Sequence, residues 1–456
     1  MLVSLAMGQT VIWERAFDAG GNDMACGVAV DYEQNVLVAG YKGSGTGHDS
    51  VITLKYDPAG NLIWARRFGI NTFSQGMAVA ADKNNNVIVA GYRQNGTSAF
   101  LIIKYDKNGS FRWAKEYLHG TWDGACGVAV DNDNNIIATG WYSTGGYWDP
   151  LTVKFDSSGN FIWARTFPTG YASYTLRTKT DATNNIYAAG FFYPIRPPGN
   201  CGFLTIKYDQ AGNYIWDRTY TRLFPGGPEP FDGAYGIAVD KNNNPVVTGA
   251  LVYTSYDCVT IKYDPNGNRL WVRTYDSGDN NGGGGVTADR LDNVVVVAAN
   301  NVTDILKYDP GGTLTWQGSH NFSISMDVAA DTLNNFYAVG DNGTDMYIVK
   351  YGVASKIQEK SNSLLVPDLL TIHPNPFQIL TSISFTLKNT SSIVLKVYDQ
   401  SGREVVVLAK TILSEGKHTL KWDGRDKKGQ IVPAGIYYVI YKDGDAIVSR
   451  KLLLVR

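Results

Sequence analysis

Residues 262–275 read KYDPNGNRLWVRTY, and five variants of this string begin at positions 55, 104, 154, 207 and 307. In each copy an Asp that accepts backbone N–H groups precedes, by three residues, a Gly able to take the left-handed conformation of a bulged hairpin. The string therefore predicts two β-strands joined by a tight turn. Its repetition predicts a repeat architecture.

A second pattern precedes each copy and completes the repeated unit. It reads GVAVDYEQNVLVAG from position 27 and GVAVDNDNNIIATG from position 127, and related copies begin at 77, 177, 236, 285 and 327. Each unit then holds four runs of alternating apolar residues separated by turns rich in Asp, Asn and Gly. Four strands in a unit of roughly 45–55 residues predict the blade of a β-propeller.

The two ends of the repeat region complement each other. Residues 11–17, VIWERAF, match the fourth strand of a unit without its first three, whereas the seventh unit ends after its third strand at Tyr351. We expect the N-terminal strand to complete the last blade, because this closure leaves no open sheet edge. The expected fold is all-β: a seven-bladed β-propeller over 10–352, a polar linker over 353–365 and a small Ig-like sandwich over 366–456.

Composition excludes several classes of partner. The 41 basic and 42 acidic residues give a net charge of -1, so no global field draws the protein to nucleic acid or to an anionic membrane. No run of 18 apolar residues predicts a transmembrane segment. The four cysteines lack metal-ligand spacing, and we expect small buried thiols, with neither a cofactor nor a metal site. The sequence leaves open whether a cation is bound in a structural role.

The first nine residues, MLVSLAMGQ, form an apolar stub. Ala6-Met7-Gly8 resembles the small-x-small end of a signal peptide that lacks its basic region. We interpret residues 1–9 as the remnant of a signal peptide and expect a mature start near Gln9 or Thr10. The expected location is extracellular or on the outer-membrane surface.

The motif DSVITLKYDPAGNLIWARRF at 49–68, followed by GMAVAADKNNNVIVAGY at 76–92, resembles the SBBP-type bacterial β-propeller repeat. The resemblance covers nearly all of residues 10–352. It implies the propeller fold and an exported protein. It implies no activity, because that family is known mostly as repeats in exported proteins without an assigned reaction.

The C-terminal region resembles the type A sorting domain of the type IX secretion pathway and the Ig-like domain of flagellar hook-capping proteins. The matching strings are PNPF at 374–377, YD at 398–399 with Gly402, WDG at 422–424 and AGIY at 434–437. The resemblance implies export through the type IX machinery, with sorting residues Pro374, Asn375, Pro376, Phe377, Gly435, Tyr437 and Lys451. Both PNPF and AGIY are also typical of plain strand entries and bends.

Binding is expected on one face of the propeller. The connections between the second and third strands, and between successive blades, are long and varied, and variable loops on a rigid scaffold concentrate binding residues. We predict ligand contacts from the polar and aromatic residues of these loops, namely Asp23, Trp122, Asp123, Tyr147, Trp148, Asp149, Arg196, Arg222 and Asp232.

Three of these aspartates share one register. Asp23, Asp123 and Asp232 each stand four residues before the Gly of a first strand. They would ring the channel mouth and bind a cation or a sugar hydroxyl, or they would simply bond the backbone of their own loops.

Catalysis finds little support in the sequence. Neither a Ser-His-Asp arrangement nor an HExxH motif occurs, and nothing selects one pair of carboxylates for glycoside cleavage. The first hypothesis is an exported, non-enzymatic propeller that binds a glycan or a protein. The alternatives are an extracellular carbohydrate-active hydrolase or lyase that uses carboxylates of the same face, and a structural component of a surface layer.

Overall fold

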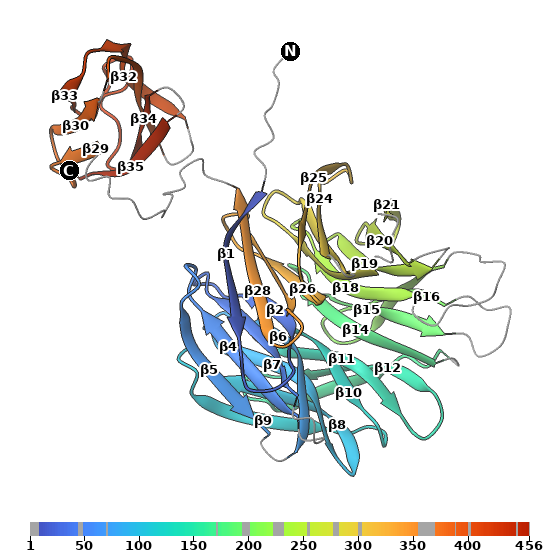
Figure 1. The fold of residues 1–456 in the computed structure, drawn as a ribbon. Helices are drawn as coiled ribbons and strands as arrows, with labels where there is room; N and C mark the ends of the chain where they lie inside the picture. Colours follow the sequence, from blue (N-terminus) through green and yellow to red (C-terminus); the bar gives the residue numbers. More distant parts are fainter. Residues whose placement is uncertain are drawn as a thin grey trace. The chain divides into compact units, whose positions relative to one another are not determined.

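The computed structural model describes residues 9–43, 49–69, 72–169, 172–193, 201–221, 232–252, 256–276, 282–299, 303–353, 370–387, 389–399, 403–443 and 446–455. The chain divides into two compact units, Met1–Val353 and Ala354–Arg456. All regular elements in the described residues are strands, which confirms the expected all-β fold (Figure 1). Within those residues, no helix has the length and apolarity needed to span a membrane.

The first unit contains seven antiparallel sheets of four strands, and each sheet is one blade of a propeller. Blade 1 consists of β2 (Asp23–Val30), β3 (Val36–Lys42), β4 (Ser50–Tyr56) and β5 (Leu62–Phe68). Blade 2 consists of β6 (Phe73–Ala81), β7 (Val87–Asn95), β8 (Thr97–Tyr105) and β9 (Phe111–Tyr117). Blade 3 consists of β10 (Gly124–Val130), β11 (Ile136–Ser143), β12 (Trp148–Phe155) and β13 (Phe161–Thr166). Blades 4 and 5 are formed by β14 (Ala172–Thr180), β15 (Ile186–Tyr193), β16 (Gly202–Tyr208) and β17 (Tyr214–Tyr220), and by β18 (Gly233–Val239), β19 (Pro245–Val252), β20 (Tyr256–Tyr263) and β21 (Arg269–Tyr275).

Blade 6 is formed by β22 (Gly282–Ala288), β23 (Val294–Ala299), β24 (Thr303–Tyr308) and β25 (Leu314–His320). Blade 7 consists of β26 (Ile324–Ala330), β27 (Phe336–Asp341), β28 (Met346–Val353) and the N-terminal strand β1 (Gln9–Phe17). β1 pairs antiparallel with β28, with Trp13 opposite Lys350 and Phe17 opposite Met346. The two ends of the propeller sequence are thus joined in one sheet.

The core lies between neighbouring blades. One cluster, for example, packs Val38 and Leu54 of blade 1 against Tyr337, Val339 and Ile348 of blade 7. The first strands of successive blades contact one another, so these strands are innermost and line the central channel. We call the side with the connections between second and third strands and between blades the loop face. The opposite side, with the short turns, is the turn face.

The repeat string of the opening motif bonds several blades to the next one. Trp271 on β21 donates its indole N–H to the Pro310 carbonyl at 3.1 Å, and the Arg273 Nε donates to the Gly312 carbonyl at 2.5 Å. The same Trp and Arg bonds recur from Trp13, Arg15, Trp64, Arg66, Trp216 and Arg218. The accepting carbonyls belong to the turn between the third and fourth strands of the following blade.

A buried ion pair recurs inside the blades. Lys262 on β20 lies with its Nζ 2.8 Å from the Asp240 Oδ2, and the two side chains are 3% and 0% exposed. Equivalent pairs join Lys55 to Asp31, Lys104 to Asp82, Lys154 to Asp131 and Lys307 to Asp289. Burial alone would raise the pKa of Asp240, but hydrogen bonds from Lys262 and Asn244 outweigh it and lower that pKa.

A ring of hydrogen bonds runs around the turn face. In each blade one turn residue has a positive φ and its side-chain oxygen accepts a backbone N–H from the preceding blade. Asn134 does so from Lys83 at 2.9 Å, and Gln34 accepts from Thr332 at 2.9 Å across the joined ends of the propeller. The other acceptors are Asn85, Asn184, Asn243, Asp292 and Asn334. All seven blades contribute, so the backbone donors of this face are satisfied within the ring.

The second unit is a two-sheet sandwich. One sheet holds β29 (Leu370–His373), β30 (Thr381–Leu387) and β33 (Gly416–Trp422); the other holds β32 (Glu404–Leu413), β31 (Ser391–Asp399), β34 (Gly435–Asp443) and β35 (Ala446–Leu454). Its core includes Phe377, Phe385, Trp422 and Tyr441. This arrangement agrees with the expected Ig-like sandwich.

Candidate functional site

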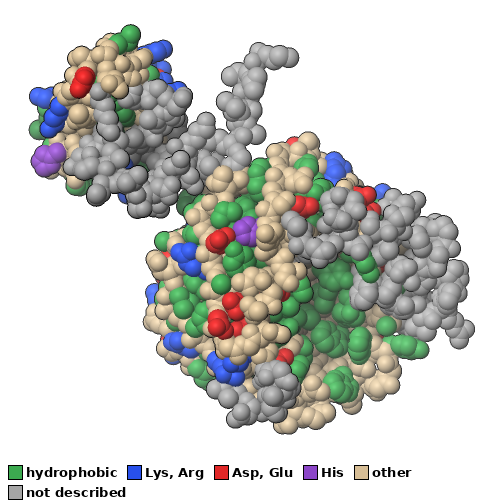
Figure 2. Space-filling view, viewed as in Figure 1, with side chains coloured by type: hydrophobic (Ala, Val, Ile, Leu, Met, Phe, Trp, Pro, Cys, Tyr) green, Lys and Arg blue, Asp and Glu red, His purple; other side chains and the backbone are tan. Residues whose placement is uncertain are grey.

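Aromatic side chains gather around the channel mouth on the loop face. From blade 2 to blade 4, ring centroids lie 6.1 Å apart between Tyr92 and Trp141, and 5.8 Å apart between Trp141 and Tyr174. Trp148 lies 5.8 Å from Tyr174 and 6.5 Å from Trp141. We call this set the aromatic arc; its members are Phe73, Tyr92, Trp141, Trp148, Tyr174, Phe191 and Tyr235. Figure 2 shows hydrophobic side chains gathered in the hollowed centre of the propeller.

Register explains why the arc covers one side of the mouth. The residue after the repeat Gly of the second strand is aromatic in blades 1 to 4, where it is Tyr41, Tyr92, Trp141 and Phe191. The equivalent positions in blades 5 to 7 are Ala250, Ala299 and Asp341, each paired with the first strand in the same register. The aromatic surface therefore ends where the small and acidic residues begin.

Glycines make room for two of these rings. A Cβ on Gly124, opposite Trp141 in the blade 3 sheet, would lie 2.5 Å from the indole. A Cβ on Gly233 of blade 5 would lie 2.3 Å from the Cβ of Phe191. Real side chains do not approach so closely, so these two glycines let the rings lie flat against the inner strands.

Arg177 on β14 closes the channel below the arc. Its Nη1 donates to the Cys126 carbonyl of blade 3 at 3.0 Å and its Nη2 to the Cys26 carbonyl of blade 1 at 3.1 Å. A side chain from blade 4 that bonds to blade 1 must cross the channel. In blades 1, 3, 5 and 6 the same register holds Gly27, Gly127, Gly236 and Gly285, which leaves room for the Arg177 side chain, and blade 7 places Asp327 in this register.

Further charged side chains lie near this floor. Lys179, two residues along β14, has a lowered pKa because the surrounding wall desolvates its ammonium group, while Asp327 of blade 7 opposes the shift and Arg177 adds to it. The Asp327 carboxylate also accepts the Val28 N–H at 3.2 Å. Burial raises the pKa of the neighbouring Cys26 and Cys126 thiols to about 12.

Polar side chains adjoin the blade 2 end of the arc. Gln75 on β6 donates its Nε2 to the Asp49 Oδ2 at 2.7 Å, and its Oε1 accepts a hydrogen bond from the Tyr92 hydroxyl. Desolvation by burial raises the pKa of Tyr92, so this hydroxyl stays protonated and donates. A carboxylate, an amide and a phenol thus meet beside an aromatic surface.

The predicted aromatic residues are exposed as expected of a loop face. Trp148 is 47% exposed and belongs to the arc. Tyr147 and Trp122 are 56% and 49% exposed, and neither belongs to it. Asp149 accepts the Thr169 N–H at 3.1 Å. Arg196 and Arg222 lie outside the described residues.

The predicted aspartates do not form an open ring. Asp123 is 0% exposed, and its carboxylate accepts the N–H groups of His119 and Gly120. Asp23 is 2% exposed and accepts the Ala19 N–H at 2.5 Å; burial raises its pKa, an effect that the Ala19 bond partly opposes. Asp232 is 6% exposed. Asp23 and Asp123 therefore shape their own loops, which is the second of the two interpretations drawn from the sequence.

The sequence contains a pattern that marks the aromatic arc, although the arc residues were not among the predicted ligand contacts except for Trp148. Tyr92, Trp141 and Tyr174 belong to strands, and only loop residues were considered as ligand contacts. The aromatic residue that follows Gly in AGY, TGW and AGF of the first four units, against Ala or Asp later, marks the same side of the mouth. Within the described part of the chain, no group of three or more His, Cys, Asp or Glu residues is arranged to hold a metal ion.

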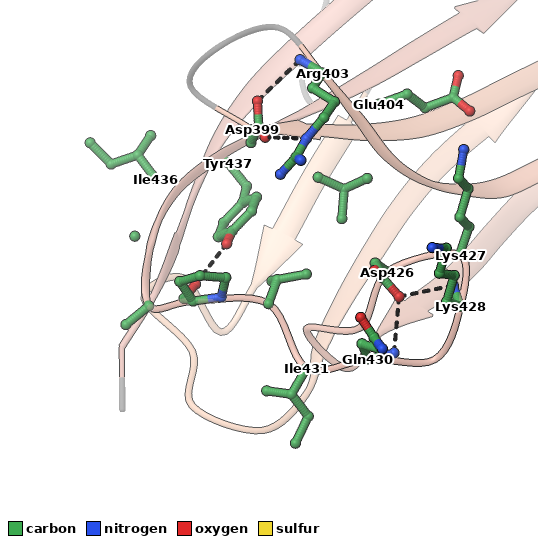
Figure 3. Close-up of a pocket in the computed structure, with 15 residues that line it drawn as sticks. Asp399, Arg403, Glu404, Asp426, Lys427, Lys428, Gln430, Ile431, Ile436 and Tyr437 are labelled. Carbon is green, nitrogen blue, oxygen red and sulfur yellow. Dashed lines mark hydrogen bonds and ion pairs between the residues drawn. The ribbon is translucent and has the colours of Figure 1, made fainter.

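The Ig-like unit has a second candidate site. A pocket of about 790 Å³ opens between the start of β32, the 426–433 turn and the start of β34 (Figure 3). Val405, Val432 and Ile436 give it apolar walls, and Lys427 and Lys428 lie at its rim. It includes Gly435 and Tyr437 of the AGIY string.

Local hydrogen bonds fix the pocket walls. The Tyr437 hydroxyl donates to the Pro433 carbonyl at 2.6 Å, and Asp426 accepts the N–H groups of Lys428 and Gln430 (Figure 3). The Arg403 Nε lies 3.0 Å from the Asp399 Oδ2. The carboxylates of Asp399 and Asp426 are therefore already engaged, and Glu404 on the same wall pairs with Lys396 at 2.8 Å, while the nearby Lys427 charge also helps to lower the pKa of Glu404.

The PNPF string is bound to the last strand. The Asn375 Nδ2 donates to the Lys451 carbonyl at 2.7 Å, and its Oδ1 accepts the Leu453 N–H at 2.9 Å. Phe377 packs on Trp422 with ring centroids 5.5 Å apart, and Pro374 accepts a hydrogen bond from the Thr381 hydroxyl. These residues have a structural role in covering the edge of β35.

Comparison with known proteins agrees with the division into a propeller and an Ig-like unit. Residues 378–443 match the family of FlgD Ig-like domains. A stretch of 97 residues is 29% identical to the uncharacterized WD repeat-containing protein L264 of Acanthamoeba polyphaga mimivirus, which is 18% of this chain and 7% of that relative. The chain thus matches only a small part of that protein.

Two solved structures are similar to the chain. The WD40 domain of Neurospora crassa Pan2 has a TM-score of 0.52 and 11% identity, covering 77% of this chain and 98% of that one. PorZ, an essential bacterial surface component of the type-IX secretion system of Porphyromonas gingivalis, has a TM-score of 0.48 and 12% identity, covering 94% of this chain and 59% of that one. The likeness to the WD40 domain shows the propeller fold and nothing of its ligand.

Proposed function

We propose that this chain is an exported binding protein that acts at the cell surface or outside the cell. The SBBP-type propeller presents a glycan or protein site on its loop face, and the Ig-like unit directs the chain to the type IX secretion machinery. The observation that carries the binding role is the contrast between the two faces. The turn face satisfies its own backbone donors in a closed ring, whereas the loop face exposes large aromatic rings around a hollow.

Exposed aromatic side chains on a rigid scaffold favour binding. Exposing Trp148 and Tyr147 to water costs free energy that a ligand recovers when it covers them. The ring of blades holds them in place, since Trp and Arg side chains bond several blades to the next one. The Asp123 carboxylate, a predicted ligand contact, is engaged with loop backbone, which favours retention of a ligand over its cleavage.

A screen of polysaccharides and surface proteins tests the binding role. The full chain is passed over each immobilised ligand, and both retained protein and released product are measured. Retention without release is expected. Release of shortened sugar would instead support the carbohydrate-active enzyme, and self-association with no retention would support the surface-layer component.

The sorting role rests on the resemblance of the second unit and is supported by the pocket beside Gly435 and Tyr437. A bacterium with a working type IX pathway would express the full chain behind a signal peptide, alongside a chain that ends at residue 352. Only the full chain should reach the medium or the outer surface. Equal export of both chains would contradict a sorting role.

A further inference from the structure

We propose that the aromatic arc binds a neutral glycan, which lies in the channel mouth across blades 2 to 4. This inference rests on the proposed binding role of the loop face and adds the chemical class of the ligand and the residues that hold it.

The apolar part of the site suits a sugar ring. One face of a pyranose carries C–H groups that pack on aromatic surfaces, and its edge carries hydroxyl groups. Trp148 and Tyr174 meet at an interplanar angle of 77°, and Trp141 and Trp148 at 42°. Rings inclined to one another in this way present faces in more than one direction. A flat stack would offer only one face.

The polar part suits hydroxyl groups. Gln75 both donates and accepts, and Asp49 accepts, at the end of the arc beside Tyr92. A sugar hydroxyl also donates and accepts, so it can join this network without leaving a polar group unpaired. Gln75 belongs to blade 2, as Tyr92 does, and Asp49 belongs to blade 1. A sugar that stacks on Tyr92 therefore has polar partners in the same blade and in the neighbouring one.

The charges favour a neutral sugar over an acidic one. Asp49 and Asp149 place carboxylates at the two flanks of the arc, and an anionic sugar would be repelled by them. Among the described residues, the Arg177 guanidinium below the arc already donates to the carbonyls of Cys26 and Cys126 on the channel floor. Because this side chain closes the channel, a glycan lies across the mouth and does not thread the ring.

Binding of the full chain to defined oligosaccharides tests the proposal. The probes are the hexasaccharides of β-1,3-glucose, β-1,4-glucose and β-1,4-mannose, with oligogalacturonate as the acidic counterpart. Dissociation constants are measured by calorimetry with ligand up to about 1 mM, the range of weak single-site binding. At least one neutral probe should bind, and oligogalacturonate should not. Binding of oligogalacturonate alone, or of none of the probes, would overturn the neutral-glycan assignment.

Variants locate the site. Trp148→Ala should weaken binding of the neutral probe at least about tenfold, as expected for loss of a stacking aromatic, and Trp148→Phe should retain most of it. Phe161→Ala is the control, because Phe161 is 54% exposed on an outer strand, and it should bind within about twofold of the wild type. Trp122→Ala tests the predicted loop-face contact outside the arc, where Trp122 is 49% exposed. The midpoint of thermal unfolding verifies that each variant folds.

The outcomes separate this inference from the proposed function. Loss of binding in Trp122→Ala with none in Trp148→Ala would place the ligand on the loop face but outside the arc, and would overturn the inference alone. Binding that only Phe161→Ala abolishes would overturn both, because the ligand would then occupy the outer edge of the ring.

Discussion

The buried Lys262–Asp240 pair provides a quantitative test of how the repeats stabilise the ring. Lys262→Met keeps the length of the side chain and removes its charge. The Asp240 carboxylate, 0% exposed, would then lose its cationic partner 2.8 Å away. Removing one partner of a buried pair costs about 3–5 kcal/mol, because the other charge stays desolvated.

The same blade offers a matched control. Lys241 lies 2.9 Å from the Asp292 Oδ2, but its side chain is 63% exposed. Lys241→Met removes a pair of the same chemistry in which the lysine is hydrated and only the Asp292 side chain, 6% exposed, is buried, so it should cost less than Lys262→Met. The difference between the two variants measures the effect of burial on the pair.

Guanidinium unfolding of the full chain, followed by tryptophan fluorescence, measures both costs. Ten of the 11 tryptophans lie in the propeller, so the signal reports mainly on that unit. Equal costs for the two variants, both under about 1 kcal/mol, would refute the reasoning, because a desolvated pair cannot be that weak.

The pH dependence adds a second readout. The lowered pKa of Asp240 in the folded protein means that the pair contributes stability above the unfolded pKa of about 4 and loses it as the pH falls through the lower folded value. The gap between wild type and Lys262→Met should therefore narrow below about pH 4. A gap that widens on acidification would contradict the assigned sign.

Three further outcomes follow from the structure. Asn134→Ala should destabilise the propeller by about 1–2 kcal/mol, because it loses the bond from Lys83 and forces Ala to a φ of 62°, whereas Asn134→Gly should cost less; equal costs in denaturant unfolding would contradict the role of the backbone conformation. The four free, buried cysteines should not react with a thiol reagent at about pH 8 in the folded chain and should all react after denaturation; a fast-reacting native thiol would contradict their burial. Tyr437→Phe should lower the stability of the Ig-like unit by about 1 kcal/mol through loss of the bond to Pro433, and an unchanged melting transition would show that water replaces that bond.

The fold could be predicted from the sequence because the residues that form each turn are close together in the chain. Asp264 and Gly267 act within one hairpin, so their chemistry is visible in six consecutive residues, and the repetition then implies the blade. The Trp of the fourth strand recurs with the string, and Trp271 bonds to the turn of the next blade. The sequence did not predict the bonds of Arg273 or those of the turn-face ring. These bonds join residues 39–61 positions apart, and the bond between Gln34 and Thr332 joins residues 298 positions apart. Which residues face each other over such separations is defined only once the ring has assembled.

The candidate site was only partly readable. Trp148 begins β12 at the end of a connection of unusual composition, which is why the sequence predicts it as a ligand contact. Tyr92 and Trp141 follow a repeat Gly inside a strand, and such positions are filled for packing as often as for binding. Their exposure on the loop face depends on the bulge and the register of the innermost strand, which place them above the channel floor. Arg177 was missed for the same reason.

Hydrogen–deuterium exchange of the full chain with and without the neutral oligosaccharide that binds it tests the central claim most directly. That claim assigns the repeated turns to stability and the channel mouth to binding. The account predicts slower exchange over the arc strands β6, β7, β11, β12 and β14, with no change in the turns that carry Asn134 and Asn243. Protection confined to those turns, or to the outer strands, would contradict it.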